Sequence, residues 1–108
     1  MQNELLELST PSLRYAVSMC EANPQYRAAV IISAPEEIVR ARDIITDYLD
    51  MTQYVIPRDK DKIVWKNGSY IRFVYPDDTS RGYHFTLMLL SPSLNVKECE
   101  RARRRWLR

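Results

Sequence analysis

The chain is poor in the residues on which many catalytic and metal-binding sites depend. Its 108 residues include two glycines, Gly68 and Gly82, and a single histidine, His84. A glycine-rich phosphate-binding loop needs several glycines close together, so none is expected. The two cysteines, Cys20 and Cys99, form no CxxC pair and have no neighbours at metal-ligand spacing. We therefore expect no metal site and no cofactor.

Long hydrophobic runs are also missing. No stretch reaches the roughly 18 apolar residues that a membrane-spanning helix requires. Residues 1–10 contain two glutamates and no basic residue, unlike a signal peptide. We therefore expect a soluble cytoplasmic protein with reduced thiols and no membrane partner. Since 16 Lys and Arg stand against 14 Asp and Glu, the overall charge predicts no partner class.

The residues that are present are typical of a small α/β domain. Hydrophobic residues make up 45% of the chain and charged residues 28%, a globular balance. Helical spacing of apolar residues predicts a helix over residues 11–22, capped by Thr10, and another from Pro35 onwards. Residues 28–33 form a continuous apolar run, which is typical of a strand buried on both faces in a parallel sheet. A last strand is expected over residues 85–90.

The middle of the chain predicts a β-hairpin over residues 62–75. Two β-rich runs flank Asn67-Gly68, a dipeptide that favours a tight two-residue turn of type I′. Both turn residues then need a positive φ, which glycine adopts without steric strain. Residues 1–108 are thus expected to form one domain, a mostly parallel sheet with this hairpin and flanking helices.

The two ends of the predicted sheet give less regular patterns. Residues 1–8 carry Glu4 and Glu7, which fit a doubly buried strand poorly, so a helix is favoured there. Without a strand at this position a sheet edge would be exposed, and it could pair with another chain or with a second copy. Ser91 is predicted to cap a closing helix, with Pro92 at its first position.

The order of these elements resembles the ATPase core of the large terminase subunits that package phage DNA. In that family a hairpin with Asn-Gly-Ser at its turn precedes an Arg-Gly pair and an apolar strand that ends in the two Walker B acids. The corresponding residues here are Asn67, Gly68, Arg81, Gly82, Ser91 and Pro92. The resemblance implies a truncated P-loop-ATPase-like topology and a phage or prophage origin, hence the host cell cytoplasm.

The departures from the family pattern remove its chemistry. Residues 6–12, where the phosphate loop would lie, contain neither glycine nor lysine. Ser91 and Pro92 supply no carboxylate to hold magnesium or to orient water. The resemblance therefore implies a degenerate, non-enzymatic relative. The leading hypothesis is a module that acts by protein–protein interaction or self-assembly, with a packaging, replication or host-defence protein as its partner.

A second hypothesis is a nucleic-acid-binding protein that uses a basic C-terminal helix. Four basic residues follow the spacing i, i+4, i+7, i+11, which forms one continuous stripe, and two more lie beside it. They are Lys97, Arg101, Arg104 and Arg108, with Arg103 and Arg105. Cys99, Ala102 and Trp106 form a narrow apolar seam between them. Cations also stabilise any helix C-terminus, so the same pattern is compatible with a purely structural role.

A third hypothesis is an enzyme organised around His84. A catalytic histidine needs a partner, and Asp77 or Asp78 could provide one. A surface histidine without chemistry explains the same residue more simply. Tyrosines near the strands could stack on bases, although tyrosine is also an ordinary residue of sheets.

Overall fold

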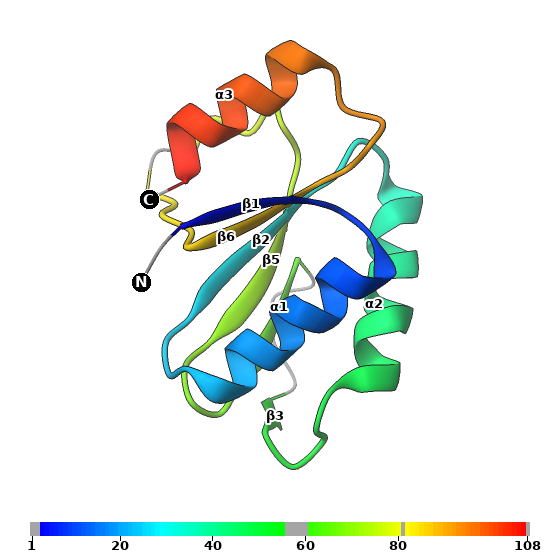
Figure 1. Cartoon of the computed structure of the whole chain (residues 1–108), viewed down its shortest axis with the longest axis vertical. Helices are drawn as coiled ribbons and strands as arrows, with labels where there is room; N and C mark the ends of the chain where they lie inside the picture. The colour runs from blue at the N-terminus through cyan, green and yellow to red at the C-terminus, as the bar shows by residue number, and fades with distance from the viewer. Residues whose placement is uncertain (1–2, 56–60, 81, 108) are drawn as a thin grey trace.

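A computed structural model of the chain describes residues 3–55, 61–80 and 82–107, which form one sheet with helices on both faces (Figure 1). The strands are β1 (Glu4–Glu7), β2 (Arg27–Ile31), β3 (Tyr54–Val55), β4 (Lys62–Trp65), β5 (Tyr70–Val74) and β6 (Leu87–Leu90). The helices are α1 (Thr10–Ala22), α2 (Pro35–Tyr48) and α3 (Val96–Trp106). Figure 1 shows α1 and α2 on one side of the sheet and α3 on the other.

The sheet has the strand order β1-β6-β2-β5-β4-β3. The pairs β1–β6, β6–β2 and β2–β5 are parallel, whereas β4 and β3 continue the sheet in antiparallel pairs. This arrangement confirms the predicted α/β class, the mostly parallel sheet and the hairpin. The P-loop-ATPase-like topology stays a prediction.

Strand β6 divides its side chains between two hydrophobic cores. Leu87 and Leu89 pack under α1 and α2, while Met88 belongs to the core under α3. All three side chains are fully buried, and burying each contributes about 1.5–3 kcal/mol. The short apolar sequence of β6 therefore joins the two layers of the protein.

The first residues form strand β1, so the predicted helix at the N-terminus is wrong. Glu4 N–H donates to the Thr86 carbonyl at 2.9 Å, and Leu8 N–H donates to the Leu90 carbonyl at 2.7 Å. The glutamates are tolerated because β1 is an edge strand, not a doubly buried one. The Glu4 carboxylate accepts a hydrogen bond from the Tyr15 hydroxyl, and Glu7 is exposed.

Helix α1 begins one residue earlier than predicted, because Ser9 and not Thr10 is its N-cap. The Ser9 hydroxyl accepts a hydrogen bond from Ser12 N–H at 3.2 Å, and Ser9 N–H donates to the Ser12 hydroxyl at 2.9 Å. This reciprocal pair is a capping box in which serine replaces the usual glutamate. Pro11 accordingly occupies the second helical position.

The closing helix, in contrast, begins later than predicted. Asn95 caps α3: its side chain accepts from Glu98 N–H at 2.8 Å, and the Glu98 carboxylate accepts from Asn95 N–H at 3.0 Å. Ser91 and Pro92 lie in a turn before it, closed by a hydrogen bond from Leu94 N–H to the Ser91 carbonyl. The capping box at Asn95 satisfies more of the first-turn N–H groups than a cap at Ser91 would.

The hairpin turn is a three-residue loop, so the type I′ prediction is wrong. Trp65 N–H donates to the Ser69 carbonyl, and Gly68 N–H donates to the Trp65 carbonyl, leaving Lys66, Asn67 and Gly68 in the loop. Gly68 has φ +89°, whereas Asn67 is not among the described residues with positive φ. The Asn67 amide instead donates to the Cys20 carbonyl at 2.7 Å, tying the loop to the end of α1.

We predict that Gly68→Val lowers the free energy of unfolding by about 1–3 kcal/mol, because valine is strained at positive φ. An added Cβ would also lie 3.2 Å from Gln25 Cγ. Gly82→Val is the matched control, since nothing lies within 4 Å of a Cβ there; its effect should stay within about 0.5 kcal/mol. Equal urea-denaturation midpoints for the two variants would show that the loop does not require glycine.

Candidate functional site

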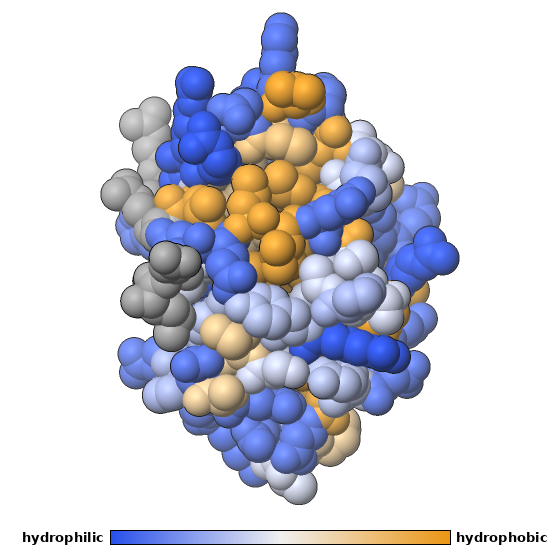
Figure 2. Space-filling view, in the orientation of Figure 1, coloured by the Kyte–Doolittle hydropathy of each residue, from blue (hydrophilic) through white to orange (hydrophobic). Residues whose placement is uncertain are grey.

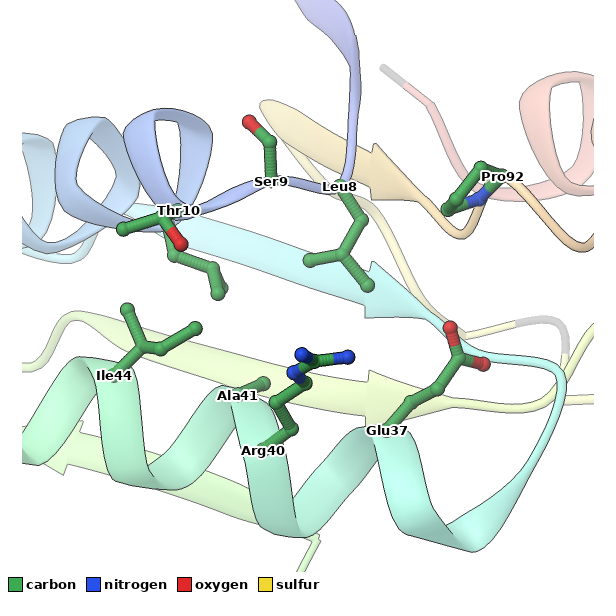
Figure 3. A pocket seen from close by; sticks show the side chains of 9 residues that line it. Leu8, Ser9, Thr10, Glu37, Arg40, Ala41, Ile44 and Pro92 are labelled. Atoms are coloured by element: carbon green, nitrogen blue, oxygen red, sulfur yellow. The ribbon is translucent and has the colours of Figure 1, made fainter.

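A cavity of about 260 Å³ opens at the carboxyl ends of the parallel strands, between the start of α1 and the first turns of α2. In α/β sheets this edge is where ligands most often bind. Figure 3 shows Glu37 and Arg40 extending from α2 towards Leu8, Ser9 and Thr10 on the facing segment. This is also the region where the terminase resemblance would put a phosphate loop.

The Glu37 carboxylate in this cavity is already engaged by the protein. One oxygen accepts from Ser33 N–H at 2.6 Å, from the Ser33 hydroxyl at 2.8 Å and from Ala34 N–H at 3.2 Å. The other accepts from the Ser91 hydroxyl at 2.5 Å. Partial burial raises the pKa of Glu37, but these hydrogen bonds outweigh it and lower the pKa below its usual value.

Ser91 therefore connects two elements and caps neither. Its hydroxyl joins the end of β6 to the N-terminal turn of α2 through Glu37, and it also accepts from Ser93 N–H at 3.2 Å. Pro92 lies beside it at the rim of the cavity. Ser91, which the terminase resemblance would align with a Walker B acid, thus ties the end of β6 to the start of α2.

The remaining candidate residues of the sequence, Gly82 and His84, show no contact within the described part of the chain that indicates a catalytic or binding role. Arg81 lies outside the described residues, and Gly82 is exposed with open space around its Cα. His84 is exposed as well. Within residues 3–55, 61–80 and 82–107, no group of three or more His, Cys, Asp or Glu side chains is positioned to hold a metal ion.

The apolar seam predicted for α3 is confirmed. Ala102 and Trp106 are fully buried, and Cys99 packs against the same core. The Trp106 indole N–H donates to the Ser80 carbonyl at 2.8 Å. Helix α3 is therefore held by its apolar side, and its opposite side faces solvent.

The basic residues of α3 do not form one uniform group. Lys97, Arg101 and Arg104 are exposed, and Arg104 lies 3.7 Å from Glu100. Arg103 is closer to the same carboxylate, at 2.9 Å. Arg105 is structural, because it donates to the Asp78 carbonyl at 2.6 Å and lies over the Trp106 ring. Arg108 lies outside the described residues.

A strand edge that the sequence did not predict runs along β1. Glu4 and Leu8 direct their N–H groups towards β6, and main-chain groups alternate in direction along a strand. The N–H and C=O groups of Leu5 and Glu7 therefore point away from the sheet. Among the described residues no strand pairs with this side of β1, so it is called a free edge.

An apolar groove of about 350 Å³ lies next to this free edge. It is lined mainly by Leu5, Leu90, Leu94 and Cys99. Figure 2 shows hydrophobic side chains gathered between α3 and β1 on this face, and Leu5 is 39% exposed. The β1 edge surface is defined here as the outward main chain of Leu5 and Glu7 together with this groove.

The sequence contains a signal for β1, although a faint one. Leu6 and Leu8 alternate towards the core under α1, while Leu5 and Glu7 alternate away from it. This period of two is the strand pattern. The two glutamates hide this pattern, because they fit an edge strand but not a central strand, where they would be buried.

Comparison with protein-family models, curated proteins and solved structures gives no match for this chain. The terminase resemblance therefore stays a hypothesis from the sequence. None of the helices in the described ranges has the length and apolar character needed to cross a membrane.

Proposed function

We propose that the protein is a non-catalytic module that binds an extended polypeptide segment at the β1 edge surface. The observation that carries this proposal is the free main chain of Leu5 and Glu7 directly beside an apolar groove. In strand addition, main-chain hydrogen bonds supply affinity and adjacent apolar pockets select side chains. The β1 edge surface offers both.

Strand β1 lacks several of the usual forms of edge protection, which supports this role. Natural sheets protect free edges with short strands, charged side chains (especially lysine), proline, bulges or a covering segment. Strand β1 is the sequence Glu-Leu-Leu-Glu, without lysine or proline, and it pairs with β6 in an unbroken register. The side chain of Glu4 is turned to Tyr15, so Glu7 is the charge left near the groove. At the opposite edge, β3 is only two residues long.

A non-catalytic role is supported by the use made of the polar groups at the strand ends. Ser9 closes the first turn of α1, and Glu37 and Ser91 bind one another. Each is thus committed to the fold. The terminase resemblance suggests a packaging, replication or host-defence protein as the source of the bound segment, and that part of the proposal rests on the sequence alone.

Selection of octapeptides from a random library against immobilised protein tests the proposal. We predict that the selected peptides are extended and carry apolar residues at alternating positions. N-methylation of the alternate residues that face β1 should weaken binding at least tenfold, because each removes a main-chain hydrogen bond, whereas methylation of the intervening residues should not.

Two variants make this test specific to the β1 edge surface. Leu5→Lys should abolish peptide binding, while Val39→Lys, on an exposed apolar residue of α2, should leave it unchanged. Selected peptides that bind Leu5→Lys as well as wild type, or that tolerate methylation at every position, would exclude strand addition.

A second candidate function is nucleic-acid binding by α3. The observation that favours it is the exposure of Lys97, Arg101 and Arg104 on the helix side opposite the buried Ala102 and Trp106. A row of exposed cations suits a phosphate backbone, and such binding does not depend on sequence. This function and peptide binding use different surfaces.

Replacing Lys97, Arg101 and Arg104 with glutamine should flatten the salt dependence of duplex-DNA binding. Each phosphate contact contributes roughly −0.9 to the slope of log affinity against log salt, so a loss of about two to three units is expected. Anisotropy of a labelled duplex measures it. Glutamine at the exposed Arg27, Arg40 and Lys66 is the matched control and should leave the slope unchanged. Equal slopes for the two triple variants would argue against α3.

A further inference from the structure

We infer that the extended segment at the β1 edge surface is β1 of a second copy of this chain, paired antiparallel about a two-fold axis with Leu5 opposite Leu5. This inference rests on the proposed function, because it names the occupant of the same surface. It would join two six-stranded sheets into one continuous sheet.

The main-chain geometry of β1 suits this pairing. Residues 4 and 8 point their N–H groups at β6, so residues 3, 5 and 7 point theirs outward. In an antiparallel pair, residues with outward main-chain groups that lie opposite one another exchange both hydrogen bonds. With Leu5 at the centre, Leu5 pairs with Leu5 of the copy, and Glu7 pairs with Asn3 of the copy.

The charges of β1 disfavour two alternative alignments. A parallel alignment in equal register would place Glu7 beside Glu7, and an antiparallel pair centred between Leu5 and Leu6 would place Glu4 opposite Glu7. Like charges directly opposite are destabilising. Centring on Leu5 puts Asn3 opposite Glu7 and Leu6 opposite Glu4, so no two carboxylates face each other.

The basic C-terminal end of α3 is complementary in charge to Glu7 of the second copy. Phe85 N–H donates to the Trp106 carbonyl, and Glu4 N–H donates to the Thr86 carbonyl. The C-terminal end of α3 and the start of β1 therefore lie at the same end of the sheet. Glu7 of the copy, which pairs with Asn3, would therefore lie near the C-terminal end of α3.

Arg103, which pairs with Glu100 at 2.9 Å in the single chain, is the cation on the groove side of α3 that would receive that glutamate. It follows Cys99 by four residues and so lies on the same side of α3 as Cys99, which lines the groove. The Arg103 side chain is 46% exposed. The acid of one copy thus meets the base of the other at both ends, which is the self-complementarity that a two-fold interface requires.

Burial of Leu5 supplies the apolar part of the interface. Leu5 is 39% exposed in the single chain, and in the pair its side chain would lie against Leu5 of the copy at the mouth of the groove. Since β1 has only four residues, the interface is small. We therefore expect reversible dimers that form at micromolar rather than nanomolar protein concentrations.

Disulfide cross-linking tests the register. On a Cys99→Ser background, Leu5→Cys should form a disulfide-linked dimer under mild oxidation, because hydrogen-bonded antiparallel pairs have Cα atoms about 5.5 Å apart, within disulfide range. Cys20 should not interfere, since it is fully buried and burial raises its thiol pKa. Glu7→Cys is the matched control, because position 7 of one copy would lie opposite Asn3 of the other, about four residues from the cysteine that the second copy carries.

We expect the Leu5→Cys dimer to form at least tenfold faster than the Glu7→Cys dimer, and Asn3→Cys/Glu7→Cys to cross-link like Leu5→Cys. Sedimentation equilibrium of the wild type should show a dimer that Leu5→Lys removes. A wild type that stays monomeric at about 500 μM, or equal cross-linking of Leu5→Cys and Glu7→Cys, would overturn self-pairing. If peptides still bound in a Leu5-dependent way, the proposed function would stand without self-pairing. If no peptide bound either, both the proposed function and self-pairing would be wrong.

Discussion

The position of β6 between β1 and β2 determines most of the remaining structure. Its residues Leu87, Met88 and Leu89 are buried on both faces, so its main-chain groups have no access to water and need partners along both edges. Strand β2 satisfies one edge and β1 the other. Because β6 requires β1, the first residues are extended in spite of their two glutamates.

The same constraint creates the free edge. Strand β1 completes the hydrogen bonding of β6, but the described residues provide no strand that does the same for β1. Helix α3 covers the face beside it without reaching over β1 closely enough to fill the groove lined by Leu5, Leu90 and Leu94. The proposed binding surface is thus a consequence of how the last strand of the chain is inserted into the sheet.

The polar side chains at the strand ends serve the structure. Ser91 follows β6 and hydrogen-bonds Glu37, which in turn accepts from Ser33 and Ala34. This network joins the ends of β2 and β6 to the first turn of α2. The chain turns once more after Ser91, and α3 begins only at the capping box of Asn95 and Glu98.

The central elements could be predicted from the sequence, whereas the edge could not. The apolar run that contains Val30 and the helical spacing of Leu13 and Val17 are local patterns, and both were confirmed. The form of β1 depends on a distant partner, β6, and the turn at Gly68 depends on the Asn67 amide reaching Cys20 at the end of α1. Such long-range contacts leave little trace in a local pattern.

We propose that the main chain of Leu5 and Glu7 is the binding edge of the protein. Residue-resolved amide hydrogen exchange tests it most directly, with dilute protein compared against protein saturated by its ligand or at high concentration. We expect the Leu5 and Glu7 amides to exchange far faster than those of Glu4, Leu6 and Leu8 in dilute protein, and to slow at least tenfold when the edge is occupied. Protection of Leu5 and Glu7 in the dilute single chain, or unchanged exchange there on binding, would contradict it.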